Sequence, residues 1–195
     1  MKKRKTIITF FSILFLIVLA GIAVAAFGDK GEILGSSFTV GSADIKFLES
    51  LTGGTLAGNL VDQLNGSSFT GISPYWQQDY SVKIYNNAET PVQLTTNAYY
   101  ETVNDPEDLR QIIFVEPWPW DDADNDGVVG DGELAAISLG RKTIIKWKTE
   151  GFDLGTLNAG EVKGLVLRFS TDTVSDTKQG ASAIFDFEFD SIGIE

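Results

Sequence analysis

An alternation of apolar and polar residues with a period of two runs through most of this sequence. The clearest example lies near the C-terminus, where Phe185, Phe187 and Phe189 alternate with acidic residues. Successive side chains of a β-strand point to opposite faces, so this segment has one aromatic and one acidic face. The same period recurs in residues 38–40, 45–47, 80–84, 145–148 and 165–169, and residues 92–100 and 111–116 complete a plausible set of strands. With turn-forming residues between these segments, the sequence predicts an all-β fold, an antiparallel jelly-roll-like β-sandwich with few short helices.

Two features of this pattern leave alternatives open. The aromatic face at residues 185–189 is interpreted as a core strand, and the alternative is a strand whose face is completed by another chain. Helical spacing of apolar residues is weak in this sequence. Residues 48–64 show some of it, but their glycines disfavour a helix. Residues 133–139 could form two helical turns.

The N-terminus has the three parts of a secretory signal. The basic run Lys2-Lys3-Arg4-Lys5 precedes an apolar segment at residues 6–27, which contains the small residues Ala23, Ala25 and Ala26. We therefore predict a signal helix within a signal peptide at residues 1–25, cleaved by a signal peptidase at these alanines. An uncleaved membrane anchor is the alternative, because the apolar segment is long enough to span a bilayer.

Residues 26–195 are then expected to form a single extracellular domain. They carry 11 basic and 27 acidic residues, a net charge of −16 over 170 residues. Nucleic acids and anionic membranes would repel such a chain, so we expect no nucleic-acid partner and membrane contact only before cleavage. The charge favours counter-cations, including divalent metals.

The sequence contains no cysteine and no histidine. No disulfide can stabilise the exported domain, which must rely on its core, a metal or partner chains. Without histidine, the chain also lacks the commonest general base and the commonest ligand of transition metals. Zinc-type hydrolysis and Ser-His-Asp chemistry are therefore excluded in their usual forms, and we expect a protein that is not an enzyme.

A twelve-residue acidic segment, 122–133, matches the calcium-loop pattern D-x-D-x-D-G-x5-E at every constrained position. Gly127 occupies the position that permits the sharp turn. Oxygen donors without nitrogen or sulfur select Ca²⁺ over transition metals. The alternative is an acidic, glycine-rich surface turn. The positions expected to bind the ion are Asp122, Asp124, Asp126, Val128 through its carbonyl, Gly130 through a water and Glu133.

The flanks of this loop differ from a helix–loop–helix hand. Prolines interrupt residues 116–120, so no entering helix can form there. We therefore predict a calcium-loop insertion near residues 117–140, between strands. Trp118 and Trp120, flanked by prolines, either form a ligand platform, for example for a sugar, or pack the loop onto the domain. Asn65-Gly66-Ser67 fits the N-glycosylation pattern.

The region after the predicted cleavage site resembles the TasA/camelysin family of exported biofilm-matrix fibre proteins. The resemblance is carried by Ala-Ala-Phe-Gly-Asp-Lys at 25–30 and by Ser-Phe-Thr-Val-Gly-Ser-Ala-Asp-Ile at 37–45. Weaker similarity extends over residues 72–100 and from residue 179 to the alternating phenylalanines. Residues 101–140 depart from the family pattern.

The resemblance implies a jelly-roll subunit that polymerises with copies of itself, and with other matrix or surface proteins, into matrix or cell-surface filaments. It also implies that residues 26–37 act as a donor strand that completes the sheet of a neighbouring subunit. The apolar part of this strand would consist of Ala26, Phe27, Ile33 and Leu34. Some members of the family are described as metallopeptidases, but no histidine is present here to support that activity.

Three functions follow from these observations. The first is a secreted filament subunit stiffened by calcium. The second is a calcium-dependent adhesin or carbohydrate-binding module that uses Trp118 and Trp120. The third is an enzyme with paired carboxylates, as in glycosidases, for which the sequence offers no isolated pair outside the calcium loop and the acidic strand faces.

Overall fold

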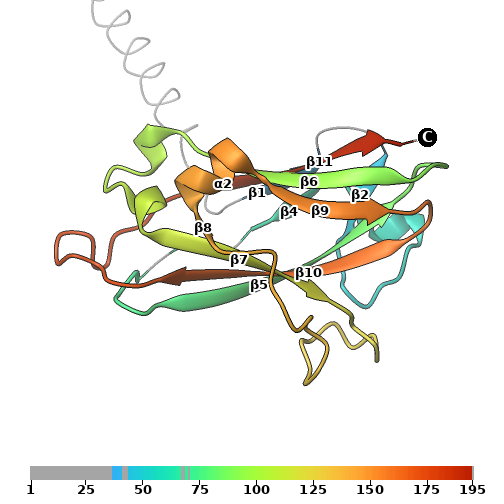
Figure 1. Ribbon diagram of the computed structural model, residues 1–195, viewed down its shortest axis with the longest axis horizontal. Coiled ribbons are helices and arrows are strands. Elements are labelled where there is room, and N and C mark those ends of the chain that lie inside the picture. The colour runs from blue at the N-terminus through green and yellow to red at the C-terminus, as the bar shows by residue number, and fades with distance from the viewer. Residues whose placement is uncertain (1–36, 41–43, 67–68, 70, 195) are drawn as a thin grey trace, which may run out of the picture. The chain divides into compact units, whose positions relative to one another are not determined.

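Two β-sheets pack face to face in the computed structural model, which describes residues 37–40, 44–66, 69 and 71–194 (Figure 1). Sheet A contains, in spatial order, β4 (Gln63–Asn65), β1 (Ser37–Val40), β11 (Asp186–Gly193), β6 (Val92–Tyr99) and β9 (Phe152–Leu157). Sheet B contains β3 (Leu60–Val61), β2 (Ile45–Leu48), β5 (Gln77–Asn86), β10 (Val162–Thr171), β7 (Ile113–Trp120) and β8 (Lys142–Thr143). The predicted all-β, mostly antiparallel sandwich is confirmed.

One strand pair departs from the antiparallel arrangement. β1 runs parallel to β11, with Phe38 opposite Phe187 and Val40 opposite Phe189. On its other side β1 pairs with β4 in the antiparallel direction. The first described strand of the chain is therefore inserted beside the last one.

The core lies between the sheets and follows the alternation of the sequence. Phe187 and Phe189 of β11 are fully buried, whereas Glu188 between them is exposed. The ring of Phe189 contacts that of Phe47 from sheet B, edge to face, with 5.3 Å between the centroids. Leu165, Leu167 and Phe169 of β10 supply matching residues from the opposite sheet. The aromatic stripe thus belongs to the core of this chain, because its partners come from the same sandwich.

The alternating segment at residues 145–148 is helical, so the prediction of a strand there is wrong. It lies in α2 (Ile144–Glu150), where Thr143 caps the N-terminus by accepting a hydrogen bond from Lys146 N at 3.3 Å. Ile144 and Trp147, three residues apart, are the buried pair. An alternation over four residues is too short to distinguish the period of a strand from that of a helix. The two buried residues are three positions apart, which fits one face of a helix.

The two weak helix predictions are also wrong. Residues 133–139 form an irregular segment with several bends and one bridge, Leu134 to Trp120. Residues 48–64 contain turns, β3 and the single 3₁₀ turn η1 (Ala57–Asn59). Two further 3₁₀ turns, η2 (Thr102–Asn104) and η3 (Leu109–Gln111), connect β6 to β7.

Several expectations lie outside the described residues. They are the signal peptide at 1–25, its cleavage at Ala23, Ala25 and Ala26, and the donor residues Ala26, Phe27, Ile33 and Leu34. Within the described part of the chain, no helix has both the length and the apolar character needed to cross a membrane. Asn65, of the glycosylation pattern, is exposed in β4.

Candidate metal centre

Residues 121–141, called the acidic arm below, connect β7 to β8 and contain the predicted calcium loop. In Figure 1 the arm lies at the bottom of the view, on the side of sheet B that faces away from sheet A. The structure therefore places the loop as a connection between strands, as the prolines before it indicated.

The prolines of β7 attach the arm to the edge of sheet B. The carbonyl oxygens of Pro119 and Pro117 accept hydrogen bonds from Ala135 N and Leu139 N, each at 2.9 Å. A strand residue directs its N–H and C=O to the same side, so the N–H that proline lacks would face the arm. The two prolines therefore remove no hydrogen bond between β7 and β10, and the pairing of these strands continues through both of them.

A row of three residues on the outer face of sheet B supports the arm. Lys83 of β5, Gly164 of β10 and Trp120 of β7 are direct neighbours across the strands. A Cβ on Gly164 would lie 2.4 Å from the backbone oxygen of Trp120, so only glycine allows this approach. Trp120 is 4% exposed, and its ring lies 5.3 Å from the Lys83 ammonium.

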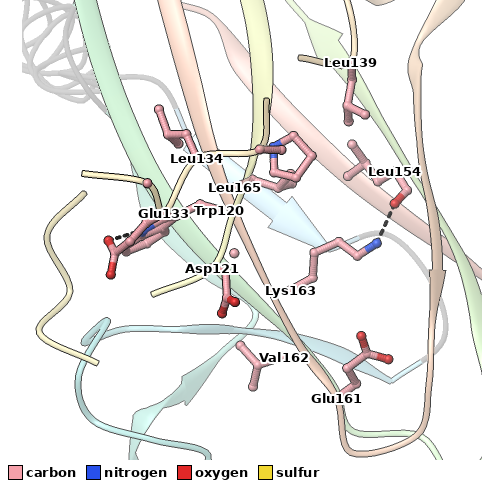
Figure 2. A pocket seen from close by; sticks show the side chains of 14 residues that line it. Trp120, Asp121, Glu133, Leu134, Leu139, Leu154, Glu161, Val162, Lys163 and Leu165 are labelled. Atoms are coloured by element: carbon pink, nitrogen blue, oxygen red, sulfur yellow. Dashed lines mark hydrogen bonds between the residues drawn. The ribbon is translucent and has the colours of Figure 1, made fainter. Parts of the chain in front are cut away.

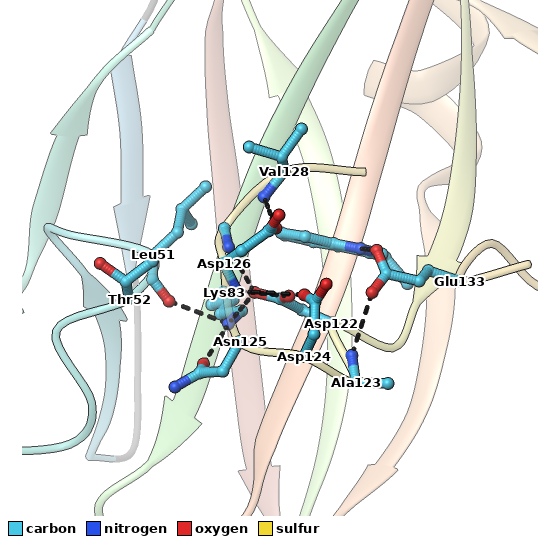
Figure 3. Close-up of polar contacts among 12 residues, drawn as sticks. Leu51, Thr52, Lys83, Asp122, Ala123, Asp124, Asn125, Asp126, Val128 and Glu133 are labelled. Atoms are coloured by element: carbon cyan, nitrogen blue, oxygen red, sulfur yellow. Dashed lines mark hydrogen bonds and ion pairs between the residues drawn. The ribbon is translucent and has the colours of Figure 1, made fainter. Parts of the chain in front are cut away.

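Within the arm, aspartate side chains fold the loop by accepting backbone hydrogen bonds (Figure 3). Asp122 accepts from Asp126 N at 3.1 Å through Oδ1 and from Gly127 N at 2.9 Å through Oδ2. Asp126 Oδ1 accepts from Val128 N at 2.7 Å. Gly127 has a φ of +74°, the left-handed conformation that glycine adopts without strain.

The structure brings together three of the predicted ligands. Asp122, Asp124 and Asp126 each offer a carboxylate oxygen, and these oxygens lie within 4.8 Å of one another. Asp124 and Asp126 are exposed, so an ion could reach them from solvent. Hard oxygen donors of this kind suit Ca²⁺.

Glu133, the last of the predicted ligands, accepts hydrogen bonds from the protein itself in this conformation. Its Oε2 accepts from Gly130 N at 2.7 Å and from Trp120 Nε1 at 3.1 Å. Its Oε1 accepts from Ala123 N at 3.2 Å. Gly130 thus contributes its N–H to Glu133, and Glu133 closes the loop onto β7 through the indole of Trp120.

Hydrogen bonding keeps two carboxylates of the loop ionised. Burial tends to raise the pKa of Asp122, but the hydrogen bonds from Lys83 and Gly127 N outweigh it, so the pKa lies below its ordinary value of 3.8. The Gly130 N–H and then the Trp120 indole hold the pKa of Glu133 below 4.5. Both groups are therefore anionic at neutral pH, as a cation site requires.

The two tryptophans differ in their surroundings. Trp120 is 4% exposed, and its indole Nε1 donates a hydrogen bond to Glu133, so little of its ring is open to a ligand. Trp118 is partly exposed and lies two residues before Trp120 in β7. The Arg168 guanidinium is 5.7 Å from the centroid of its ring. The structure therefore leaves Trp120 unavailable as a ligand platform, and it gives Trp118 a protein partner.

A cleft of about 430 Å³ lies beside the arm, between the arm, the start of β10 and β9 (Figure 2). Trp120 and Leu134 line one side, and Lys163 lies on the other, donating a hydrogen bond to Leu154 O at 2.6 Å. Its lining includes Glu133 of the calcium loop and Asp121, the first residue of the arm. The cleft is lined by apolar side chains together with both acidic and basic ones.

Sequence reasoning missed Lys83, which lies at the centre of this site. It appeared only as a polar residue in the alternation of residues 80–84. Its position under the arm depends on register between three strands and on the path of the arm, and a single sequence gives neither.

No protein-family model matches the chain, and no curated protein matches it. Among solved structures, the chain is similar to PapD-like domain 7 of human CEP192, an ASH/PapD-like domain. The two share 12% sequence identity, with a TM-score of 0.24, over 65% of this chain and 80% of that one.

Proposed function

We propose that this protein is an exported, non-enzymatic structural subunit whose acidic arm binds a calcium ion. The convergence of Asp122, Asp124 and Asp126 carries the calcium part of the proposal. These residues occupy loop positions one, three and five of the calcium pattern, and Gly127 takes the turn conformation that the pattern needs. Carboxylates drawn together without a cation repel one another, so a bound divalent ion would stabilise the folded arm.

The bound ion would have a fourth carboxylate within reach. Glu133 lies at position twelve, and rotation away from Gly130 N and Trp120 Nε1 would turn its carboxylate toward the aspartates. The carbonyl of Val128 and a water near Gly130 would complete an oxygen shell. Calcium binding would therefore exchange hydrogen bonds to Glu133 for metal ligation.

The filament part of the proposal rests on the resemblance of residues 25–45 to exported fibre proteins. It is supported by β1, which begins at Ser37, the last residue of the proposed donor segment, and pairs with β11 and β4 of the same chain. In this proposal the domain is a jelly roll, and residues 26–37 of one copy add to a sheet of the next. A contact of this type does not close on itself, so it generates an open filament.

The calcium proposal is tested by thermal unfolding with and without chelator. Asp124→Asn with Asp126→Asn removes two ligand charges and leaves Asp122, which Lys83 also binds. In the parent, calcium at 100 times Kd should raise Tm by roughly 5–10 °C. The double variant should lose this rise, whereas Asp131→Asn, an exposed loop residue outside the cluster, should retain it. Equal melting temperatures of the parent with calcium and with chelator would refute the proposal.

Filament assembly is tested by electron microscopy of the chain beginning at Ala26. We expect filaments, and we expect Phe27→Ser, Ile33→Ser and Leu34→Ser together to abolish them at constant chain length. The variant should melt like a parent sample dissociated to monomers. A parent that remains monomeric at high concentration, with calcium present, contradicts the filament proposal and leaves the calcium proposal intact.

The carbohydrate-binding alternative loses most of its basis in this structure. Its proposed platform used the faces of Trp118 and Trp120, and the second of these is buried. A structural role therefore remains the better account of the arm.

A further inference from the structure

Lys83 is a buried cation whose ammonium group makes three hydrogen bonds, two of them to the acidic arm. Its side chain is 8% exposed, and Nζ donates to Leu51 O at 2.8 Å, Asp122 Oδ2 at 2.7 Å and Asn125 Oδ1 at 3.2 Å (Figure 3). These three bonds match the three donors of an ammonium. Two acceptors belong to the arm, and the third belongs to the loop after β2.

The ammonium is therefore a structural link between the arm and two separate parts of the domain. The arm packs on the same loop through Gly127, whose position lies against Leu51 and Thr52. Lys83 itself is fixed by β5, in the row with Gly164 and Trp120. Without any metal, one positive charge already lies next to the first carboxylate of the loop.

The same charge bears on calcium at the aspartate cluster. Asp122 Oδ2 accepts from both Lys83 and Gly127 N, whereas Oδ1 accepts one hydrogen bond, from Asp126 N at 3.1 Å, and keeps a lone pair that can face an ion. An ion bound there would lie within a few ångströms of the ammonium. Two cations this close repel each other strongly in a partly buried site, so Lys83 opposes calcium while it stabilises the empty loop.

We propose that the ammonium group of Lys83, on β5, takes the place of a metal cation beside the acidic arm. It holds the loop folded without calcium and raises the calcium concentration needed to fill the site. This inference rests on the proposed calcium function. Lys83 acts as a positioning residue, since it touches Asp122 and not the ion. The arm would then respond to calcium only at high concentration and would remain ordered below that level.

The test replaces the charge and measures calcium affinity and apo stability separately. Lys83→Met removes charge and donors, while Lys83→Gln keeps an N–H donor without the charge. Lys46→Met is the matched control, because Lys46 also pairs with carboxylates, Asp44 and Asp62, away from the arm. Calcium is titrated by calorimetry, and Tm is measured in chelator.

Both Lys83 variants should bind calcium about tenfold tighter or more than the parent, and both should melt lower in chelator. Lys46→Met should keep the parent's affinity. Tighter binding by a Lys83 variant where the parent binds none would support the inference and refute calcium binding by the parent. Unchanged or weaker calcium binding by both variants, with the parent binding normally, would overturn the inference alone. If no form binds calcium, the proposed function and this inference both fail.

Discussion

Gly127 shows how closely one residue of the acidic arm is fitted to the rest of the domain. Its φ of +74° lies in the left-handed region, and a Cβ there would lie 3.0 Å from Thr52 Cγ2 and 3.1 Å from Leu51 Cβ. Any side chain would therefore meet both backbone strain and a steric contact. The loop after β2 and the arm constrain each other at this position.

Replacing Gly127 by alanine should destabilise the domain by about 2–3 kcal/mol, from the left-handed conformation and the displaced loop together. Gly132→Ala is the matched control: its φ is +84°, with nothing within 4 Å of the added Cβ. It should cost only about 1 kcal/mol, through strain alone. Urea unfolding in chelator measures both, and equal losses would show that the contact with Leu51 and Thr52 contributes nothing.

The hydrogen bonds to Glu133 predict an acid-sensitive arm. The folded-state pKa of Glu133 lies below its ordinary value of 4.5, so its contribution to stability is complete above that pH and is lost as pH falls through the folded pKa. In chelator, the unfolding free energy should decline below about pH 4.5. Glu133→Gln, which cannot ionise, should give a shallower decline. Parallel pH profiles of parent and variant would contradict this assignment.

At the scale of elements, α2 illustrates what tertiary packing adds to a local pattern. Trp147 stacks on Phe187 with 4.5 Å between centroids and 14° between planes. Its Nε1 donates to Thr96 O at 3.0 Å, and the side chain is fully buried. One residue thus fixes the short helix on sheet A.

Trp147→Phe should retain most of the ring packing but leave the Thr96 carbonyl without its indole donor, which costs about 1–3 kcal/mol. Trp147→Ala should cost about 3–5 kcal/mol through the cavity it creates. Chemical denaturation ranks the two variants. A loss for Trp147→Phe near that of Trp147→Ala would mean that the hydrogen bond, rather than the packing, anchors α2.

The elements also show which parts of the structure a single sequence could give. The alternating segments at 80–84 and 165–169, and 185–189 from Asp186 onward, form strands, because the residues of one face are buried along the whole segment. The calcium pattern located the aspartate cluster, because its spacing is local. The helix at 144–150 and the position of Lys83 under the arm escaped prediction, since both depend on contacts between residues far apart in the chain.

On the scale of the whole molecule, lysines protect one edge of the sandwich. β9 is an edge strand of sheet A, and lysine side chains from other elements donate hydrogen bonds to carbonyls in it and directly before it. Lys163 Nζ donates to Leu154 O of β9 at 2.6 Å, and Lys142 Nζ donates to the carbonyl of Gly151, the residue before β9, at 2.5 Å. Charged side chains on an edge discourage pairing with another chain.

Lys142→Met with Lys163→Met should therefore expose this edge to strand pairing. We expect increased self-association by light scattering under conditions where the parent is dispersed. Lys148→Met, a lysine that instead bonds Tyr100 O, should behave like the parent. Equal scattering by all three proteins would show that β9 is protected in another way.

The parallel alignment of β1 with β11 has a mechanical consequence. Three residues of β1 lie opposite Phe187, Glu188 and Phe189, and both strands run in the same direction. Tension on the N-terminal end of β1 and the C-terminal end of β11 therefore slides one strand along the other. The hydrogen bonds between them bear the load together instead of opening one by one, and the rate at which this short contact shears would set how long the domain withstands pulling.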